Sequence, residues 1–365
     1  MTSTTTTGTD GRITVRISDP GELVAAVPHL LSFRPGESVV LLNHSGGKQR
    51  RIIPVIRADL PDDTGEPDAV RVLVRSLLRH PGTGVTVVIV GRRPGHRAAP
   101  GEVPHQRLVH RLVAAFEAAG RPVDHALWVP EIRGGAPWTC YHDDCSPGVQ
   151  PDDRETVLAA TMATRGLVTY GSRDELARQL DPDDPAAIQR RERLLDAAVD
   201  ALAKRPPADA IPAATGHFDD DESAEHLAVV RAALARAAAG DVALNDEDVV
   251  SLAMALSDLR VRDGCLATAE PPGSPPANAA ERLWFELVRR TPPPERAEPA
   301  VLLGFSAYRR GDCVLAGLAF DNALAAHPGH RFAGLLQLCL NRQLPPETLG
   351  RLSRSQEGGL MPTDP

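Results

Sequence analysis

The residue types best suited to chemistry are gathered in the segment 138–145, Trp-Thr-Cys-Tyr-His-Asp-Asp-Cys. Cys140, His142 and Cys145 can each bind zinc, through a thiolate or an imidazole nitrogen. A structural zinc site usually takes four ligands, commonly two cysteine pairs, and no second pair follows these two cysteines. His125 or Asp143 would have to complete the ligand set.

The alternative for this segment is a hairpin whose cysteines pack as small hydrophobic residues beside Trp138. Because the ligand count is incomplete, the sequence favours this alternative. It therefore predicts no cofactor, with zinc as the disfavoured choice.

A second group of candidate residues follows the carboxyl ends of predicted strands, where open α/β sheets bind their ligands. An arginine at such a place can hold a carboxylate or a phosphate through two parallel hydrogen bonds. The strand ends offer Asp59, Arg92, Arg93, Arg97 and Glu131. The alternative is a solvated loop in an arginine-rich chain, and the composition favours that alternative.

Common nucleotide-binding and catalytic motifs are absent from the sequence. Gly46-Gly47-Lys48 lacks the spaced glycine and the following Ser or Thr of a phosphate-binding P-loop. No G-x-G-x-x-G follows a predicted strand, and no G-x-S-x-G is present. The sequence therefore contains no complete catalytic constellation.

Composition narrows the class of protein. A length of 365 residues favours two domains, and a net charge of −8 argues against non-specific binding to nucleic acid. No apolar run approaches the roughly 18 residues of a membrane span, and the polar start, MTSTTTTGTDG, reads as a disordered tail. Five cysteines in so long a chain form no disulfide framework, which predicts a cytoplasmic location.

The stretch 16–42 predicts the nucleus of an α/β domain: strand, helix, turn, strand. Asp19 and Pro20 suit the N-cap and the first position of a helix, and Ser38 to Leu42 suits an interior strand. A short turn then returns the chain along Arg51 to Asp59, so these two strands should be antiparallel. Pro54 has no backbone N–H, so the second of them should lie near an edge or carry a bulge.

Helices alternate with strands over the next hundred residues. Helices are predicted near 67–80 and 107–119, and strands at 85–90, the best candidate for the centre, and 123–129. The fold class is therefore α/β, with a mixed, layered sheet in a domain spanning 12–180.

Strand patterns end before the polar segment 181–185, and a helical domain is predicted over 187–355. Within it, residues 299–328 have the spacing of one tetratricopeptide-like helical hairpin, with Ala316 and Phe320 at its crossing. Gly311 and Asp312 should separate the two helices, and Asn322 is expected on the exposed face.

Four stretches together carry a resemblance to a known family. They are ISDPGELVAAVPHLLSFRPGESVVLL, RADLP at 57–61, the cysteine segment, and GFSAYRRGDCVLAGLAFDNALAAHPGHRFAGLLQLCL. The chain resembles the actinobacterial domain-of-unknown-function family numbered 4192, over about 13–352. The resemblance implies a cytoplasmic bacterial protein and supplies no activity. The family often has a further cysteine after the second one, where this chain has Ser146, which speaks against a role for the cysteines.

Two functions fit these observations. The favoured one is a non-enzymatic interaction or regulatory protein that binds a protein partner through its helical domain, and neither nucleic acid nor a membrane. The alternative is an enzyme or small-ligand binder that uses the arginines at the rim of the sheet. A specific protein recovered by co-purification favours the first, and a bound metabolite favours the second.

Overall fold

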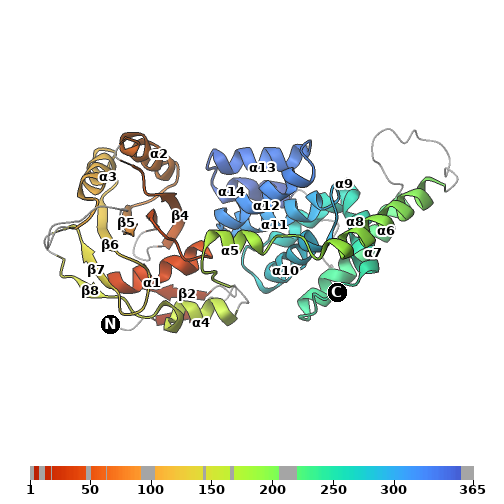
Figure 1. Cartoon of the computed structure of the whole chain (residues 1–365), viewed down its shortest axis with the longest axis horizontal. Coiled ribbons are helices and arrows are strands. Elements are labelled where there is room, and N and C mark those ends of the chain that lie inside the picture. The colour runs from red at the N-terminus through yellow and green to blue at the C-terminus, as the bar shows by residue number, and fades with distance from the viewer. Residues whose placement is uncertain are drawn as a thin grey trace. The chain divides into compact units, whose positions relative to one another are not determined.

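Figure 1 shows a computed structural model of the chain. It describes residues 4–7, 13–17, 19–46, 51–62, 64–91, 103–142, 145–164, 168–204 and 220–354. The chain divides into two compact units, Met1–Leu176 and Ala177–Pro365. The first contains a six-stranded mixed sheet and the second is helical, so the predicted fold class is confirmed.

The sheet of the first unit has the order β4-β3-β5-β6-β7-β8. Only β5 and β6 are parallel, and every other neighbouring pair is antiparallel. As predicted, Pro54 lies in an edge strand, and 85–90 lies in a fully buried interior strand. The strands are β3 (Ser38–Ser45), β4 (Arg51–Asp59), β5 (Gly84–Val90), β6 (Val123–Val129), β7 (Pro137–Cys140) and β8 (Gly148–Val149).

The first long helix, α1 (Pro20–Leu31), begins as its sequence predicts. The Asp19 carboxylate accepts hydrogen bonds from the backbone N–H groups of Gly21, at 2.7 Å, and Glu22, at 3.2 Å. These bonds satisfy donors that have no partner inside the helix, and Pro20 has no N–H to satisfy. The predicted order of strand, helix and strand over 16–42 is therefore present.

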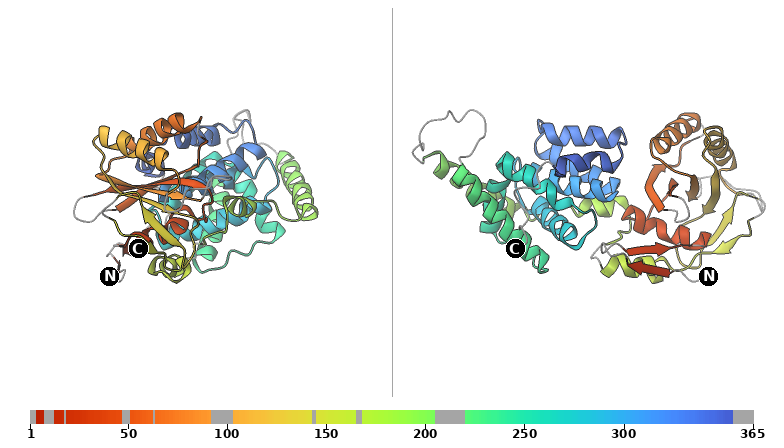
Figure 2. Two further views of the ribbon diagram at one scale, coloured as in Figure 1. Left: turned by 60° about the vertical axis from the view of Figure 1, so that its left-hand side comes forward. Right: turned by 180° about the vertical axis from the view of Figure 1, so that it is seen from behind.

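Helices cover both faces of the sheet, as Figure 1 shows. On one face, α2 (Glu66–Leu78) and α3 (Gln106–Ala118) form a continuous buried core with Val87 and Ile89 of β5. The view from behind in Figure 2 shows α1 on the opposite face. Because side chains alternate along a strand, Val88 and Val90 face α1. The sheet therefore lies between two helical layers.

The N-terminal residues correct one prediction. Thr4–Thr7 form strand β1, which pairs antiparallel with β2 (Ile13–Arg16) in a separate two-stranded sheet. Threonine is β-branched and favours extended backbone, and β2 supplies the partner hydrogen bonds. Polarity alone therefore did not predict the structure of this stretch.

The remaining elements of the first unit are short. The 3₁₀ segment η1 and α4 follow β8, and α5 contains the division between the units. Their bounds are η1 (Asp153–Glu155), α4 (Val157–Thr164) and α5 (Arg173–Arg178).

Every regular element that the structure describes after α5 is helical. The core of this unit contains Trp284, Phe305, Tyr308 and Phe320, all fully buried. The elements are α6 (Pro185–Ala203), α7 (Asp220–Ala238), α8 (Asp246–Ser257), α9 (Leu259–Cys265), η2 (Leu266–Ala269), α10 (Pro275–Arg290), α11 (Ala297–Arg310), α12 (Cys313–Ala326), α13 (Arg331–Asn341) and α14 (Pro346–Arg354).

The helical pair α11 and α12 has the boundary and the buried residues that its sequence predicts. Gly311 ends α11 with a φ of 92°, and the Asp312 carboxylate accepts a hydrogen bond from the N–H of Leu315 at 2.9 Å. Ala316 and Phe320 are fully buried. Asn322 was predicted to be exposed, but it is half-buried, and its amide donates to the Leu180 carbonyl at 3.3 Å.

The segment 181–185 is tied to the helical unit by named contacts. The N–H of Asp183 donates to the Arg289 carbonyl at 2.8 Å, and its carboxylate pairs with buried Arg191 at 3.1 Å. The Asp184 side chain caps α6. These residues therefore belong structurally to the second unit.

Candidate functional site

The predicted rim site is only partly within the described residues. Strands β4, β5 and β6 run in the same direction, so their carboxyl ends lie at the same end of the sheet, as the prediction requires. Arg92, Arg93 and Arg97 lie outside the described residues. Asp59 pairs with Arg57 at 2.5 Å, and Glu131 pairs with Arg133 at 3.0 Å. Both carboxylates are exposed. The two carboxylates therefore already have basic partners.

The candidate zinc ligands give a more definite result. His125, Cys140 and Cys145 each offer a ligand atom, and these atoms lie within 4.8 Å of one another. We name these three residues the thiol–imidazole cluster. His142, which the sequence placed among the ligands, is outside this group, and Asp143 lies outside the described residues.

Strand pairing explains how the cluster forms. Cys140 of β7 lies directly opposite Leu127 of β6, so both side chains are on one face of the sheet. His125 precedes Leu127 by two residues and shares that face. The N–H of Cys145 donates to the His142 carbonyl at 3.3 Å, which holds Cys145 close to His142.

Trp138 shares the face of β7 on which Cys140 lies, because the two are two residues apart. A side chain at Gly21, in the first turn of α1, would lie 2.8 Å from the indole nitrogen of Trp138. The cluster is therefore on the side of the sheet that α1 covers. Cys140 is buried, whereas His125 and Cys145 are half-buried.

The electrostatic surroundings favour the thiolate of Cys140. Burial alone would raise the pKa of this thiol, but hydrogen bonds from the His125 side chain and the backbone N–H of His142 oppose that effect. Cys145 and the Ala126 backbone add two further hydrogen bonds. The net result is a Cys140 pKa below the ordinary value of the thiol. A thiolate is the form that binds metals and reacts as a nucleophile.

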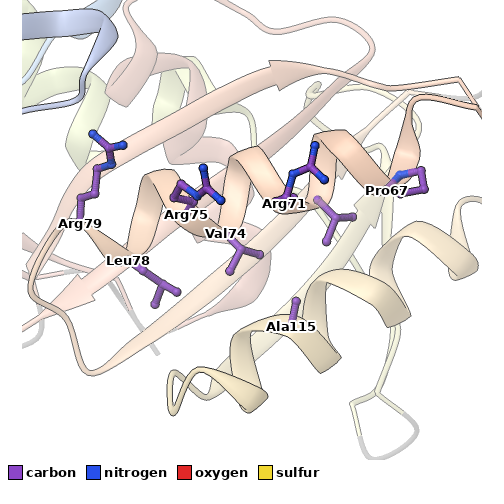
Figure 3. Close-up of a pocket in the computed structure, with 8 residues that line it drawn as sticks. Pro67, Arg71, Val74, Arg75, Leu78, Arg79 and Ala115 are labelled. Carbon is purple, nitrogen blue, oxygen red and sulfur yellow. The ribbon is translucent and has the colours of Figure 1, made fainter.

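A second feature is a groove between α2 and α3, shown in Figure 3. Its volume is about 610 Å³. Its apolar part faces the space between the helices, and the three arginines stand along one side of α2. We name it the α2–α3 groove, lined by Pro67, Val70, Arg71, Val74, Arg75, Leu78, Arg79 and Ala115.

The arginine row of this groove follows from helical spacing. Arg71, Arg75 and Arg79 are four residues apart, so they project from one side of the helix at intervals of about 6 Å. All three are exposed. Arg71 pairs with Asp68 at 2.8 Å, and Arg75 makes no ion pair within the described part of the chain. The groove is lined by three cations and no carboxylate.

Sequence reasoning assigned the helix 67–80 only a structural role. The signal for more was available, because Arg71, Arg75 and Arg79 recur at helical spacing beside Val70, Val74 and Leu78. What the pattern lacked was the partner helix. On the α3 side, the groove is lined by the small side chain of Ala115. No sequence pattern indicates that α3 packs beside α2.

No helix among the described residues is long and apolar enough to cross a membrane. Neither the curated proteins nor the solved structures contain a match to this chain. One protein family matches, described as a domain of unknown function (DUF4192), over residues 20–347. That span covers both units, and the chain belongs to this family.

Proposed function

We propose that the chain is an interaction protein whose α2–α3 groove binds an acidic amphipathic helix of a partner protein. The observation that carries the proposal is an apolar floor beside three exposed arginines, with no carboxylate among the lining residues. Helix-in-groove recognition combines these two kinds of contact: apolar anchors fill the groove and charges at its rim set the orientation.

The apolar contacts define the pattern of the partner. The floor residues Val70, Val74 and Leu78 extend over about 12 Å of α2, at 1.5 Å per residue. Val70 and Val74 are 8% and 9% exposed, so a partner helix would meet only the outer edges of these side chains and the half-buried Leu78. It could place apolar residues at positions i, i+4 and i+7 along them.

The arginine row determines that the partner helix should be acidic. With a net charge of −8, the whole chain repels an acidic partner at long range, so attraction must come from the local arginine row. Exposed charges are screened over about 8 Å at physiological salt, and contacts at hydrogen-bonding distance survive that screening better. Binding should therefore weaken with salt without being abolished by it.

The structure also offers an apolar feature on the helical unit, where the sequence placed the partner. Leu335 and Leu338 of α13 are 52% and 50% exposed and lie on one side of the helix. They are single side chains on a convex helix, whereas the α2–α3 groove combines a shallow apolar depression with charge. For this reason we assign partner binding to the α2–α3 groove and not to α13.

Two finer inferences accompany this proposal. We take α11 and α12 as a tetratricopeptide-like hairpin, which supports a role in binding proteins without itself forming a superhelical groove. We also place the protein in the cytoplasm, because all five cysteines are free thiols.

The proposal is tested by selection from a library of helix-forming peptides on the immobilised full-length chain. The selected peptides should carry leucine or isoleucine at i, i+4 and i+7, flanked by Glu or Asp at intervals of four. They should lose at least about tenfold in affinity, or about 1.4 kcal/mol, for an Arg75→Glu variant. Arg154→Glu is the matched control, because Arg154 is also exposed in the first unit and lies outside the groove.

The same peptide selection can contradict the proposal in two ways. Enrichment of neutral or basic peptides, or of acidic peptides that bind the Arg75→Glu protein as tightly as the native chain, contradicts the proposal. Peptides that instead lose binding to a Leu335→Ser variant move the binding face to α13.

A further inference from the structure

We propose that the thiol–imidazole cluster is a zinc site in which His125, Cys140 and Cys145 are the three protein ligands. This site lies on the α1 side of the sheet, whereas the α2–α3 groove lies on the other. The inference therefore goes beyond the proposed partner binding and does not depend on it.

The distances suit zinc. Zinc–sulfur and zinc–imidazole bonds are about 2.3 Å and 2.0–2.1 Å, so neighbouring ligand atoms in a tetrahedral site are about 3.5–3.8 Å apart. The three ligand atoms of the cluster already lie within 4.8 Å of one another. Side-chain adjustments of about 1 Å therefore complete the geometry.

The backbone fixes the positions of two ligands before metal binds. His125 and Cys140 come from neighbouring hydrogen-bonded strands, and the N–H of Tyr141 donates to the Ala126 carbonyl at 2.8 Å beside them. The N–H of Cys145 donates to the His142 carbonyl at 3.3 Å, which positions the third ligand. Ligands held on a preformed scaffold lose less conformational freedom on binding, which increases affinity.

The chemistry of the donors also suits zinc. Two thiolates and one neutral imidazole balance the 2+ charge of the ion and match its borderline-soft character. Three protein ligands leave the fourth position to water or to a further donor.

Two other interpretations explain less. Packing as small hydrophobic residues, which the sequence favoured, requires no imidazole beside the two sulfur atoms. A disulfide between Cys140 and Cys145 would likewise leave His125 without a role. Metal binding uses all three side chains at once.

The experiment uses the full-length reduced chain, freed of metal with a chelator and then titrated with zinc against a chromophoric chelator. One zinc ion per chain should bind, and elemental analysis after desalting should find it. Cobalt in place of zinc should give the near-ultraviolet absorption of a metal–thiolate bond.

The main variants are His125→Ala and Cys145→Ser, because both side chains are half-buried and their replacement leaves the core in place. Each should lower zinc affinity by at least about 100-fold, since loss of a mere second-shell partner already costs 10–100-fold. Cys339→Ser and His110→Ala are the matched controls, and both should retain zinc. Cys339 is a half-buried thiol of the helical unit, and His110 is an exposed histidine of α3.

Three results overturn the proposal. One is a folded, reduced native chain that binds no zinc at micromolar concentrations. The second is a cobalt complex without thiolate absorption. The third is retention of zinc by the His125→Ala protein, and its simultaneous loss from a His142→Ala protein would restore the ligand set predicted from the sequence alone.

Discussion

Gly304 of α11 lies against the ring of Phe320 of α12. A β-carbon added at Gly304 would be 3.0 Å from Cζ of Phe320 and closer still to two other ring carbons. Both residues are in the fully packed contact between the two helices, and Phe320 is completely buried. The absence of a side chain at Gly304 is therefore what allows the helices to approach at this point.

Gly304→Ala should destabilise the protein. The extra methyl group would gain helix propensity, up to about 1 kcal/mol, but it overlaps a buried ring that has no room to move. Overpacking of this kind costs about 1–3 kcal/mol, so the net change should be a loss. Chemical denaturation measures the free energy of unfolding, and an unchanged or increased value would mean that the two helices are further apart than described.

Ala316→Leu tests the same crossing from the other helix. Ala316 is fully buried, so three added carbon atoms should cost about 1–3 kcal/mol. Ala325→Leu is the matched control, because Ala325 belongs to the same helix and is exposed. It should change the free energy of unfolding by no more than about 0.5 kcal/mol. Equal effects of the two substitutions would contradict the described packing.

Phe320→Ala removes the ring and leaves a cavity. The cost should be about 3–5 kcal/mol, typical of a fully buried aromatic side chain. Combined with Gly304→Ala, the loss should be smaller than the sum of the two single losses, since the added methyl group no longer meets a ring. A double-mutant cycle measures this coupling, and strict additivity would show that the two residues do not touch.

The hairpin shows what local pattern can predict. Helical spacing, the Gly311-Asp312 boundary and the small residue at Ala316 are properties of neighbouring residues, and the structure contains them all. Asn322 shows where such reasoning ends. Its exposure depends on Leu180, a residue 142 positions away that no helical pattern connects to it.

The thiol–imidazole cluster shows the same division. The sequence named every member, His125 included, because donor types and spacing are visible in it. It placed His142 among the ligands because nearness along the chain is the only distance that a sequence gives. The register of β7 against β6 brings His125 beside Cys140 instead, and strand register is a long-range property.

Arg75→Glu, the variant that should weaken peptide binding at least about tenfold, should itself fold normally. Arg75 is exposed and makes no ion pair within the described part of the chain. The expected change in the free energy of unfolding is within about 0.5 kcal/mol. Denaturation of the variant checks this, and a loss above about 1 kcal/mol would show that the arginine row stabilises the fold rather than a complex.

Glu298 carries the pH-dependent prediction. It accepts hydrogen bonds from Arg262 and His330, both at 3.1 Å, and all three side chains are largely buried. Burial alone would raise the pKa of Glu298, but the His330 hydrogen bond and the charge of Arg262 outweigh it and hold the pKa below its ordinary value. The ionised carboxylate is therefore the form that stabilises the helical unit.

Glu298→Gln should cost about 1.5–3 kcal/mol at pH 7, because Arg262 and His330 lose a buried, charged hydrogen-bond partner, while Asp263 still pairs with Arg262 at 2.7 Å. A carboxyl whose native pKa is depressed contributes stability above its unfolded pKa, about 4.3 for Glu, and loses that contribution as the pH falls through the lower native value. The gap between native and variant stability should thus narrow as the pH falls below about 4. Urea denaturation across this range measures the gap, with Glu192→Gln, an exposed position of α6, as the control that should show almost none. A gap that stays the same down to pH 3, or that narrows on the alkaline side, would mean that Glu298 is not the charged partner of Arg262.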